Sequence, residues 1–217
     1  MHIPFYKRLL SFLFPVTLQR TIGSQLTVLE LQLYRNHYIL VTPRAMYSYH
    51  LQYDPFRNTF RNIQSELANV NSFLLLGTGL GSALQILQQQ YHCYPQTTCV
   101  DNDETVIEFC RNYMQLNTRN NVEWIYDDVR HFLETQTKTY DLIGIDIFKE
   151  LVMPAFIARH TFIMQCRSAL NPNGICIFNM IFEDDNEILQ TERRLQEHFH
   201  RVVTIPDKMN TYFIAFA

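Results

Sequence analysis

The sequence predicts an α/β fold whose mostly parallel sheet is covered by helices on both faces. Three observations favour this fold. Short apolar runs alternate with segments of helical spacing, glycines gather after the first of these runs, and two adjacent apolar runs close the chain. Strands that alternate with helices are typical of a parallel sheet, because each crossover helix packs on a face of the sheet. The short connection 206–210 between the last two runs predicts a final antiparallel pair.

Two units are expected within the 217 residues: a small unit of residues 1–52 and an α/β domain of residues 53–217. Apolar and polar residues alternate in 26–34, and 38–42 and 45–49 continue the pattern, which predicts a small antiparallel meander. A meander of this size is not stable alone. We therefore expect it to pack on the α/β domain or on another subunit.

The α/β domain contains seven predicted strands. They are expected at 72–76, 97–100, 122–126, 140–146, 175–179, 201–205 and 211–216. Asp54-Pro55 predicts the start of a helix before the first strand, because Asp caps helix N-termini and Pro suits the first turn. That helix extends to about Asn69, and further helices are expected at about 81–90, after Asp103, after Asp128, at 155–170 and around 185–198.

Composition excludes several classes of function. A formal charge of −3 without a basic cluster gives no reason to expect a nucleic-acid partner. The apolar run 9–14 is interrupted by Pro15 and is too short to span a membrane, so a short amphipathic helix is expected there. Five scattered cysteines and eight histidines lack metal-ligand spacing, which predicts neither a disulfide framework nor a metal site. Reduced thiols indicate the cytoplasm.

The turn Gly77-Thr78-Gly79-Leu80-Gly81 follows the first apolar run of the α/β domain. It contains three of the six glycines of the chain, and a helix-compatible segment begins at Ala83. A strand, a glycine turn and a helix together bring backbone N–H groups and a helix N-terminus close to a ligand. Glycine is needed because a Cβ would block either a positive φ or the approach of that ligand. The turn is therefore the predicted cradle of a nucleotide-like cofactor.

Acidic residues end the next three strands, at the edge where ligands of open parallel sheets bind. Asp101 is expected to accept the hydroxyls of a ribose, although it could instead only shape the turn before the next helix. Asp128, or Asp127 beside it, is expected to accept a hydrogen bond from an adenine amino group, and a helix-capping role is compatible with this. Neighbouring Asn102 and Val129 are expected to contact the same ligand.

Asp146 is the candidate for chemistry. A carboxylate at the end of a buried strand is partly desolvated, so it can serve as a base or orient a nucleophile. Asp141 is expected at the opposite edge with a structural role. Some residues could reach the mouth of the pocket if the meander folds over it, although core or interface packing explains them equally well: Arg44, Tyr47, Tyr49 and Tyr53.

Five segments resemble the class I S-adenosylmethionine-dependent methyltransferases in order and spacing, and within them the spermidine synthase-like proteins. These segments are 77–81, Val100-Asp101-Asn102-Asp103, Tyr126-Asp127-Asp128, 140–146 and Leu170-Asn171-Pro172-Asn173-Gly174. The resemblance implies a Rossmann-like class I methyltransferase fold with a seven-stranded sheet, and a homodimer. It implies that Asp146 faces an acceptor amine and that the cofactor contacts are Gly77, Thr78, Gly79, Leu80, Gly81, Asp101, Asn102, Asp127, Asp128 and Val129.

The chain departs from the pattern of aminopropyltransferases at two positions. Leu80 and Lys149 stand where those enzymes carry Asp, so we expect weaker attraction for a polyamine and less repulsion of a cofactor carboxylate. The preferred hypothesis is therefore methyl transfer from S-adenosylmethionine to an unidentified small acceptor, an amine among the candidates. The alternative is aminopropyl transfer from decarboxylated S-adenosylmethionine, and a further one is a non-catalytic cofactor-binding or assembly protein. An NAD-binding protein fits less well, because the third glycine comes one position early.

Overall fold

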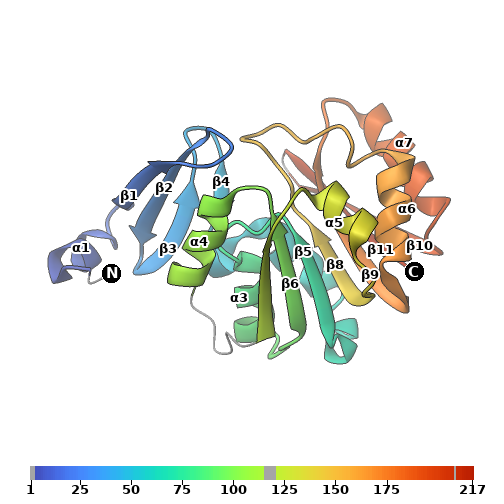
Figure 1. The fold of residues 1–217 in the computed structure, drawn as a ribbon, viewed down its shortest axis with the longest axis horizontal. Coiled ribbons are helices and arrows are strands. Elements are labelled where there is room, and N and C mark those ends of the chain that lie inside the picture. Colours follow the sequence, from blue (N-terminus) through green and yellow to red (C-terminus); the bar gives the residue numbers. More distant parts are fainter. Residues whose placement is uncertain (1–2, 115–120, 208) are drawn as a thin grey trace.

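The computed structural model describes residues 3–114, 121–207 and 209–217, and these form two sheets that lie side by side (Figure 1). The smaller, antiparallel sheet comes from the N-terminal part of the chain. The larger sheet has seven strands and helices on both faces. No helix among the described residues is long and apolar enough to cross a membrane.

The smaller sheet has the strand order β1-β2-β3-β4 and follows a short helix, α1. Its elements are α1 (Phe5–Leu10), β1 (Val16–Ile22), β2 (Val28–Tyr34), β3 (His37–Val41) and β4 (Met46–Ser48). The predicted meander is confirmed, whereas the helix expected at 9–14 is displaced, because α1 ends at Leu10 and 11–14 form a turn; β1 was not predicted. Its side chains are all exposed or half-buried, so it lacks the apolar alternation that marks a strand with one buried face.

The larger sheet has the strand order β10-β11-β9-β8-β5-β6-β7, in which β11 pairs antiparallel with β10 and β9 and all other pairs are parallel. Its strands are β5 (Ser72–Leu76), β6 (Gln96–Asp101), β7 (Val122–Tyr126), β8 (Tyr140–Ile145), β9 (Leu170–Ile181), β10 (Arg201–Asp207) and β11 (Asn210–Phe216). The chain first moves from β5 to β6 and β7, and later adds β8 and β9 on the other side of β5. The predicted seven-stranded sheet and its closing antiparallel pair are confirmed. The chain has a Rossmann-like class I methyltransferase fold.

Helices cover both faces of this sheet because its strands are apolar on both sides. Leu74 and Leu76 of β5 belong to one core cluster, whereas Phe73 and Leu75 belong to another on the opposite face. The first cluster includes residues of α5, α6 and α7, and the second includes residues of α2 and α3. The helical elements of this part are η1 (His50–Gln52), α2 (Asp54–Asn62), η2 (Glu66–Asn69), α3 (Ser82–Gln90), α4 (Glu104–Tyr113), α5 (Val129–Thr135), α6 (His160–Ser168) and α7 (Asp185–Gln196).

The two sheets are joined through α4 and its N-cap. Phe109 and Cys110 of α4 share a core cluster with Leu29 and Leu31 of β2. The Asp103 carboxylate caps α4 at the backbone N–H of Thr105 and also accepts the N–H of Ser24, both at 3.0 Å. One buried carboxylate therefore ties the turn after β1 to the start of a helix of the larger sheet.

The structure differs from the prediction at β9 and α6. The segment 171–174, predicted as a turn, lies within β9, which begins at Leu170. The helix expected from 155 begins instead at His160, and the residues before it belong to the loop that follows β8. The five cysteines are free and buried, so they pack as small apolar side chains.

Candidate functional site

A cavity of about 450 Å³ opens where the carboxyl ends of the parallel strands face the smaller sheet. It lies at the point where the strand order changes direction, between β5 and β8, as expected for ligand sites of open α/β sheets. The predicted residues that line it are Gly77, Gly79, Asp101, Asn102, Asp128, Val129 and Asp146. Its size suits a nucleoside-containing ligand.

The glycine turn holds its shape through three positive φ angles, 84° at Gly77, 49° at Gly79 and 70° at Gly81. A Cβ on Gly77 would collide with the backbone carbonyl of Asp146, and one on Gly79 would collide with that of Tyr47. The absence of side chains therefore lets three segments approach one another: the turn, the end of β8 and β4.

Asp101 ends β6 and braces the glycine turn. Its Oδ2 accepts the N–H of Thr78 at 2.8 Å and the Thr78 hydroxyl at 3.0 Å, and its Oδ1 accepts the N–H of Asp103 at 3.0 Å. Burial raises the pKa of Asp101, although these hydrogen bonds act in the opposite direction. An ionised carboxylate offers about four acceptor positions, so roughly one remains for a ligand hydroxyl. Asp101 therefore shapes the turn, one of the two roles that the sequence left open, and the ribose contact stays a prediction.

Asp128 and Asp127 follow β7 and mark the start of α5. Asp128 caps α5 by accepting the N–H of Arg130 at 2.9 Å, and it pairs with the guanidinium of the same residue. The side-chain hydrogen bond from Arg130 is the main cause of the lowered pKa of Asp128. Asp127 instead contacts His131 at 2.8 Å, and neither residue is among the described lining of the cavity. Of the two candidates, Asp128 is the one that lines the cavity.

Leu80, predicted as a cofactor contact, points away from the cavity. It is 2% exposed and packs with Leu31 and Leu40 of the smaller sheet and with Phe109 of α4. Leu80 thus packs against the apolar side chains of the smaller sheet. Thr78, Gly81 and Asp127 are also absent from the described lining of the cavity.

Asp146 follows β8 directly and lines the cavity, and its carboxylate is held by two hydrogen bonds. The Tyr53 hydroxyl donates to Oδ2 and the Asn179 side-chain amide donates to Oδ1, both at 2.7 Å. Burial raises the pKa of Asp146 to about 6, against the lowering effect of these two hydrogen bonds. The arrangement is a fixed carboxylate that gains and loses a proton near neutral pH, as required of a general base.

Several residues of this half of the cavity had no predicted role. Asn179 lies on β9 and its Oδ1 accepts from Asn210 of β11 at 2.7 Å, which fixes the amide that faces Asp146. Asp207 at the end of β10 accepts from the Tyr212 hydroxyl at 3.1 Å. These residues reach the cavity because β11 is antiparallel to β9, so the hairpin between β10 and β11 turns at the carboxyl edge. In the sequence, Asn179 could be noticed only as the polar residue that follows the apolar run 175–178.

The smaller sheet forms the remaining wall. Tyr47 of β4 lines the cavity, together with Tyr49 and Tyr53 from the segment after β4, as expected if the meander folds over it, but Arg44 is not among the described lining. The Tyr47 hydroxyl accepts the N–H of Glu150 at 2.9 Å, and the Glu150 carboxylate accepts the Thr42 hydroxyl at 2.5 Å. The loop after β8 is thus fastened to the smaller sheet.

Comparison with known proteins agrees with this geometry. Residues 63–214 match the model of the spermine/spermidine synthase domain. A polyamine aminopropyltransferase of Klebsiella pneumoniae is 26% identical over 156 residues, which cover 67% of this chain and 53% of that protein. The chain therefore spans about half the length of the curated relatives that it matches.

Solved structures show the same fold over most of the chain. A probable spermidine synthase from Corynebacterium glutamicum has a TM-score of 0.75 at 18% identity, over 94% of this chain and 81% of that one. Spermidine synthase from Thermotoga maritima has a TM-score of 0.68 at 16% identity, over 93% of this chain and 72% of that one. Together with the match to the domain model, which extends from the end of α2 almost to the end of β11, these likenesses agree with the sequence resemblance. The chain belongs to the spermine/spermidine synthase domain family.

Proposed function

We propose that the chain transfers an aminopropyl group from decarboxylated S-adenosylmethionine to an amine. The observation that carries this proposal is the fixed carboxylate of Asp146 in a cavity that is rich in other carboxylates. The relatives named polyamine aminopropyltransferases support it as well. The comparisons favour this reaction over the methyl transfer that the sequence favoured.

The charge of the cavity supports an amine as acceptor. Seven acidic residues and a single lysine, Lys149, are found among its described lining. The acids are Asp54, Asp101, Asp103, Asp128, Asp146, Glu150 and Asp207. Asp103 caps α4, and Asp128 pairs with Arg130. Asp146 and Asp207 instead accept hydrogen bonds from uncharged donors. Half-buried carboxylates without a cation among the described residues favour a cationic ligand. The sequence predicted fewer acidic residues in the cavity, because Leu80 stands where aminopropyltransferases carry Asp. Acidic residues that the sequence did not indicate, such as Asp54 and Asp207, line the cavity and offset this loss.

Asp146 is proposed as the general base. Because burial raises its pKa to about 6, it is mostly ionised at pH 7 and still basic enough to accept a proton. The acceptor amine attacks the methylene carbon next to the sulfonium, and the carbon–sulfur bond breaks with its electron pair left on sulfur. The nitrogen loses one proton to Asp146, and the second product is a neutral thioether. Proximity and alignment supply much of the rate, since the sulfonium is already electrophilic.

The cofactor is proposed to lie over β5, β6 and β7. Gly77 and Gly79 would meet its sugar and side chain, the remaining acceptor position of Asp101 would take a ribose hydroxyl, and Asp128 would face the adenine. The sheet order supports this division, because β9, β10 and β11 lie on the opposite side of β8. Asn179, Asp207 and Tyr212 would then surround the acceptor.

Lys149 is the one observation that favours intact S-adenosylmethionine. Its exposed ammonium lines the cavity and could pair with the cofactor carboxylate. The test is calorimetric titration with both forms of the cofactor, followed by an assay of thioether release with putrescine as acceptor. Tighter binding of the decarboxylated form and turnover with putrescine are expected. Tighter binding of the intact form would refute aminopropyl transfer and revive methyl transfer, and binding of neither would leave a non-catalytic protein.

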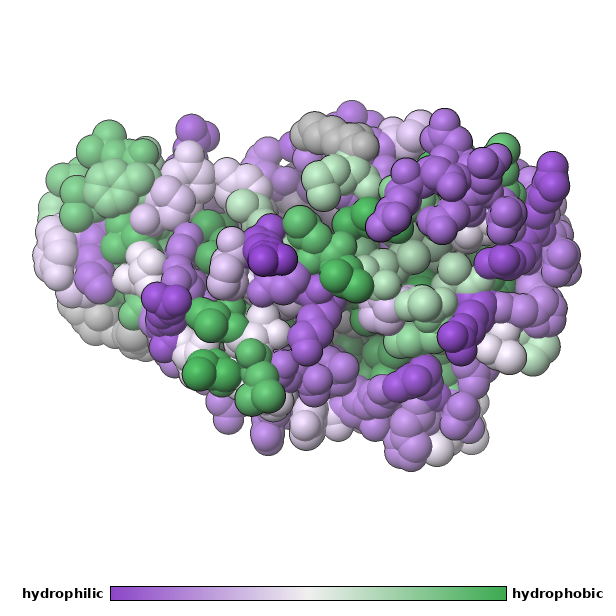
Figure 2. Space-filling model, turned by 90° about the horizontal axis from the view of Figure 1, so that it is seen from above, coloured by the Kyte–Doolittle hydropathy of each residue, from purple (hydrophilic) through white to green (hydrophobic). Residues whose placement is uncertain are grey.

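We also propose that a second copy of the chain covers the N-terminal apolar face. Figure 2 shows apolar side chains gathered at the end of the molecule that α1 forms. Phe5 is 79% exposed, Leu13 77% and Ile22 65%, and β1 is an edge strand of its sheet. An apolar face beside a free strand edge is suited to pairing with an identical face. Light scattering should give a dimer mass, and Leu13→Glu should give a monomer; a monomeric wild-type protein would refute the proposal.

A further inference from the structure

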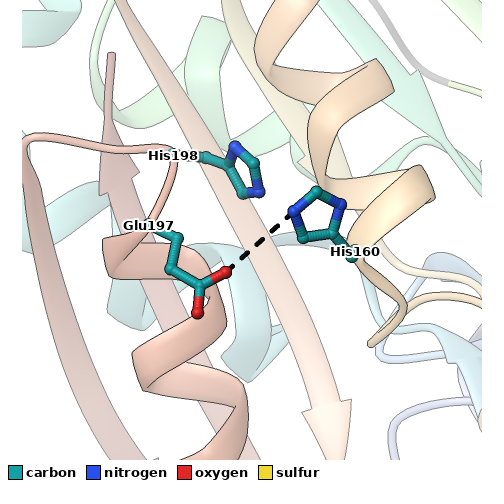
Figure 3. Close-up of side chains that lie close together, drawn as sticks. All are labelled: His160, Glu197 and His198. Atoms are coloured by element: carbon teal, nitrogen blue, oxygen red, sulfur yellow. Dashed lines mark ion pairs between the residues drawn. The ribbon is translucent and has the colours of Figure 1, made fainter.

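Three potential metal ligands from two helices meet on the surface away from the cavity. His160 begins α6, and Glu197 and His198 follow the end of α7. One ligand atom of each lies within 4.8 Å of those of the other two. Figure 3 shows the two imidazole rings and the carboxylate converging on a common point. The spacing along the chain gave no hint of this group, because α6 and α7 come together only in the folded protein.

The group is not explained by contacts within the chain. The Nε2 atom of His198 is buried, and no hydrogen-bond partner for it is found in the described part of the protein. Glu197 lies 4.0 Å from His160 Nε2, which is too long for a hydrogen bond. The two rings meet edge to face, with centroids 4.4 Å apart. A buried ring nitrogen without a partner costs free energy, which a bound cation would remove.

We propose that His160, Glu197 and His198 bind a divalent transition-metal ion such as Zn²⁺. Two imidazole nitrogens and one carboxylate oxygen are ligands that zinc prefers, and a water molecule can take the fourth tetrahedral position. Metal–ligand bonds of about 2.0–2.1 Å place ligand atoms roughly 3.4 Å apart, so these side chains must move closer than they are now. The exposed side chains of His160 and Glu197 can make this adjustment.

The ion would join the start of α6 to the end of α7. Arg194 of α7 already donates to the carbonyl of Ala158 at 3.1 Å, so the backbone around the site is partly fixed. The loop between Asp146 and His160 lines the cavity through Phe148, Pro154 and Phe156. A metal at His160 would therefore restrain one end of a loop that forms part of the candidate active site, without touching a reacting group.

The test is calorimetric titration of the untagged chain of residues 1–217 with ZnCl₂ at pH 7.5. One equivalent of Zn²⁺ should bind and raise the melting temperature. His160→Ala and His198→Ala should each weaken binding by about tenfold or more, because even indirect partners of a metal typically contribute that much. Mg²⁺, which prefers oxygen ligands, should give no comparable shift.

The matched control is His92→Asn, which removes an exposed histidine of positive φ and replaces it with a residue that tolerates this conformation. It should bind Zn²⁺ like the wild type. Absence of saturable binding would overturn the proposal. Equal affinity in the double variant His160→Ala/His198→Ala would do so too, since the ion would then occupy another place. Cofactor titration of the same variants separates this result from the fate of the proposed reaction.

Discussion

Replacing Asp146 with Asn should change how the stability of the protein depends on pH. Burial raises the pKa of Asp146 from the ordinary 3.8 to about 6 in the folded protein. The folded state therefore binds the proton more tightly than the unfolded state does. The stability that this group contributes is fully present below pH 3.8 and is lost as the pH rises through about 6. The variant has no such proton to lose.

The size of the effect follows from the two values. Their difference of about 2.2 pH units (6 minus 3.8) corresponds to about 3 kcal/mol in the free energy of unfolding. About 2.4 kcal/mol of this falls between pH 4 and pH 8. Water that enters the cavity lowers the figure, so it is an upper value. Hydrogen bonds lost with the substitution, such as that from Asn179, displace the whole curve but not its slope.

The assay is urea unfolding of wild type and variant at a series of pH values. The stability of Asp146→Asn relative to wild type should rise with pH. Asp141, just inside the opposite end of β8, is the matched control. Burial raises its pKa, but hydrogen bonds from Asn171, Asn71 and Ser72 outweigh this and leave the pKa below its usual value. The stability that Asp141 contributes is present above pH 3.8 and is lost only as the pH falls below that value, so the stability of Asp141→Asn relative to wild type should stay nearly constant from pH 4 to pH 8. A relative stability of Asp146→Asn that stays constant from pH 4 to pH 8 would refute the assignment of a raised pKa.

Three further changes test the site. Asp101→Ala should weaken cofactor binding by about 10- to 100-fold, the worth of a charged hydrogen bond, and unchanged affinity in calorimetry would rule out the ribose contact. Gly79→Ala should cost roughly 1–3 kcal/mol in urea unfolding, because the residue has a positive φ and its Cβ meets the carbonyl of Tyr47; a smaller loss would mean that the smaller sheet yields easily. Tyr53→Phe removes a hydrogen bond that lowers the pKa of Asp146, so the pH profile of turnover should move upward. An unmoved profile would show that Tyr53 does not act through Asp146.

The larger sheet was predictable because its signals are local. Each buried strand is a short apolar run, and the glycine turn and Asp146 follow directly from β5 and β8. Backbone hydrogen bonds between β5 and β8 continue to the last residues of these strands. The N–H of Asp146, for example, donates to the carbonyl of Leu76 at 2.8 Å. Residues that follow adjacent parallel strands must meet at one edge, whatever the loops do. The position of Asp146 beside the turn is thus a consequence of strand order.

Leu80 and Asp207 were not predictable because their places depend on distant segments. Leu80 is buried only because Leu29, Leu31 and Leu40 of the smaller sheet pack against the glycine turn. Asp207 ends β10 at the connection between the two closing strands, and it reaches the cavity because β11 pairs with β9, which places this hairpin beside Asn179. The smaller sheet is distant in sequence from Leu80, and β9 is distant from Asp207. The expected loss of negative charge assumed that the side chain at position 80 lines the cavity. Leu80 does not line it, and acidic residues from other segments do, such as Asp207.

The cavity lies between the two units predicted from the sequence, 1–52 and 53–217, and both supply its walls. Gly79 of the larger unit has no side chain where Tyr47 of the smaller one approaches, and Glu150 accepts hydrogen bonds from Thr42 and from the N–H of Arg44. Glu150 itself has a φ of 56°, a conformation that a residue other than glycine keeps only where surrounding contacts hold it. A substitution that destabilises the smaller sheet should therefore disturb two parts of the cavity. It should shift the loop after Asp146 on the acceptor side, and it should shift the glycine turn on the cofactor side. We expect such changes to alter the affinity for both substrates together, whereas changes at Asp207 or Asp128 should each alter one.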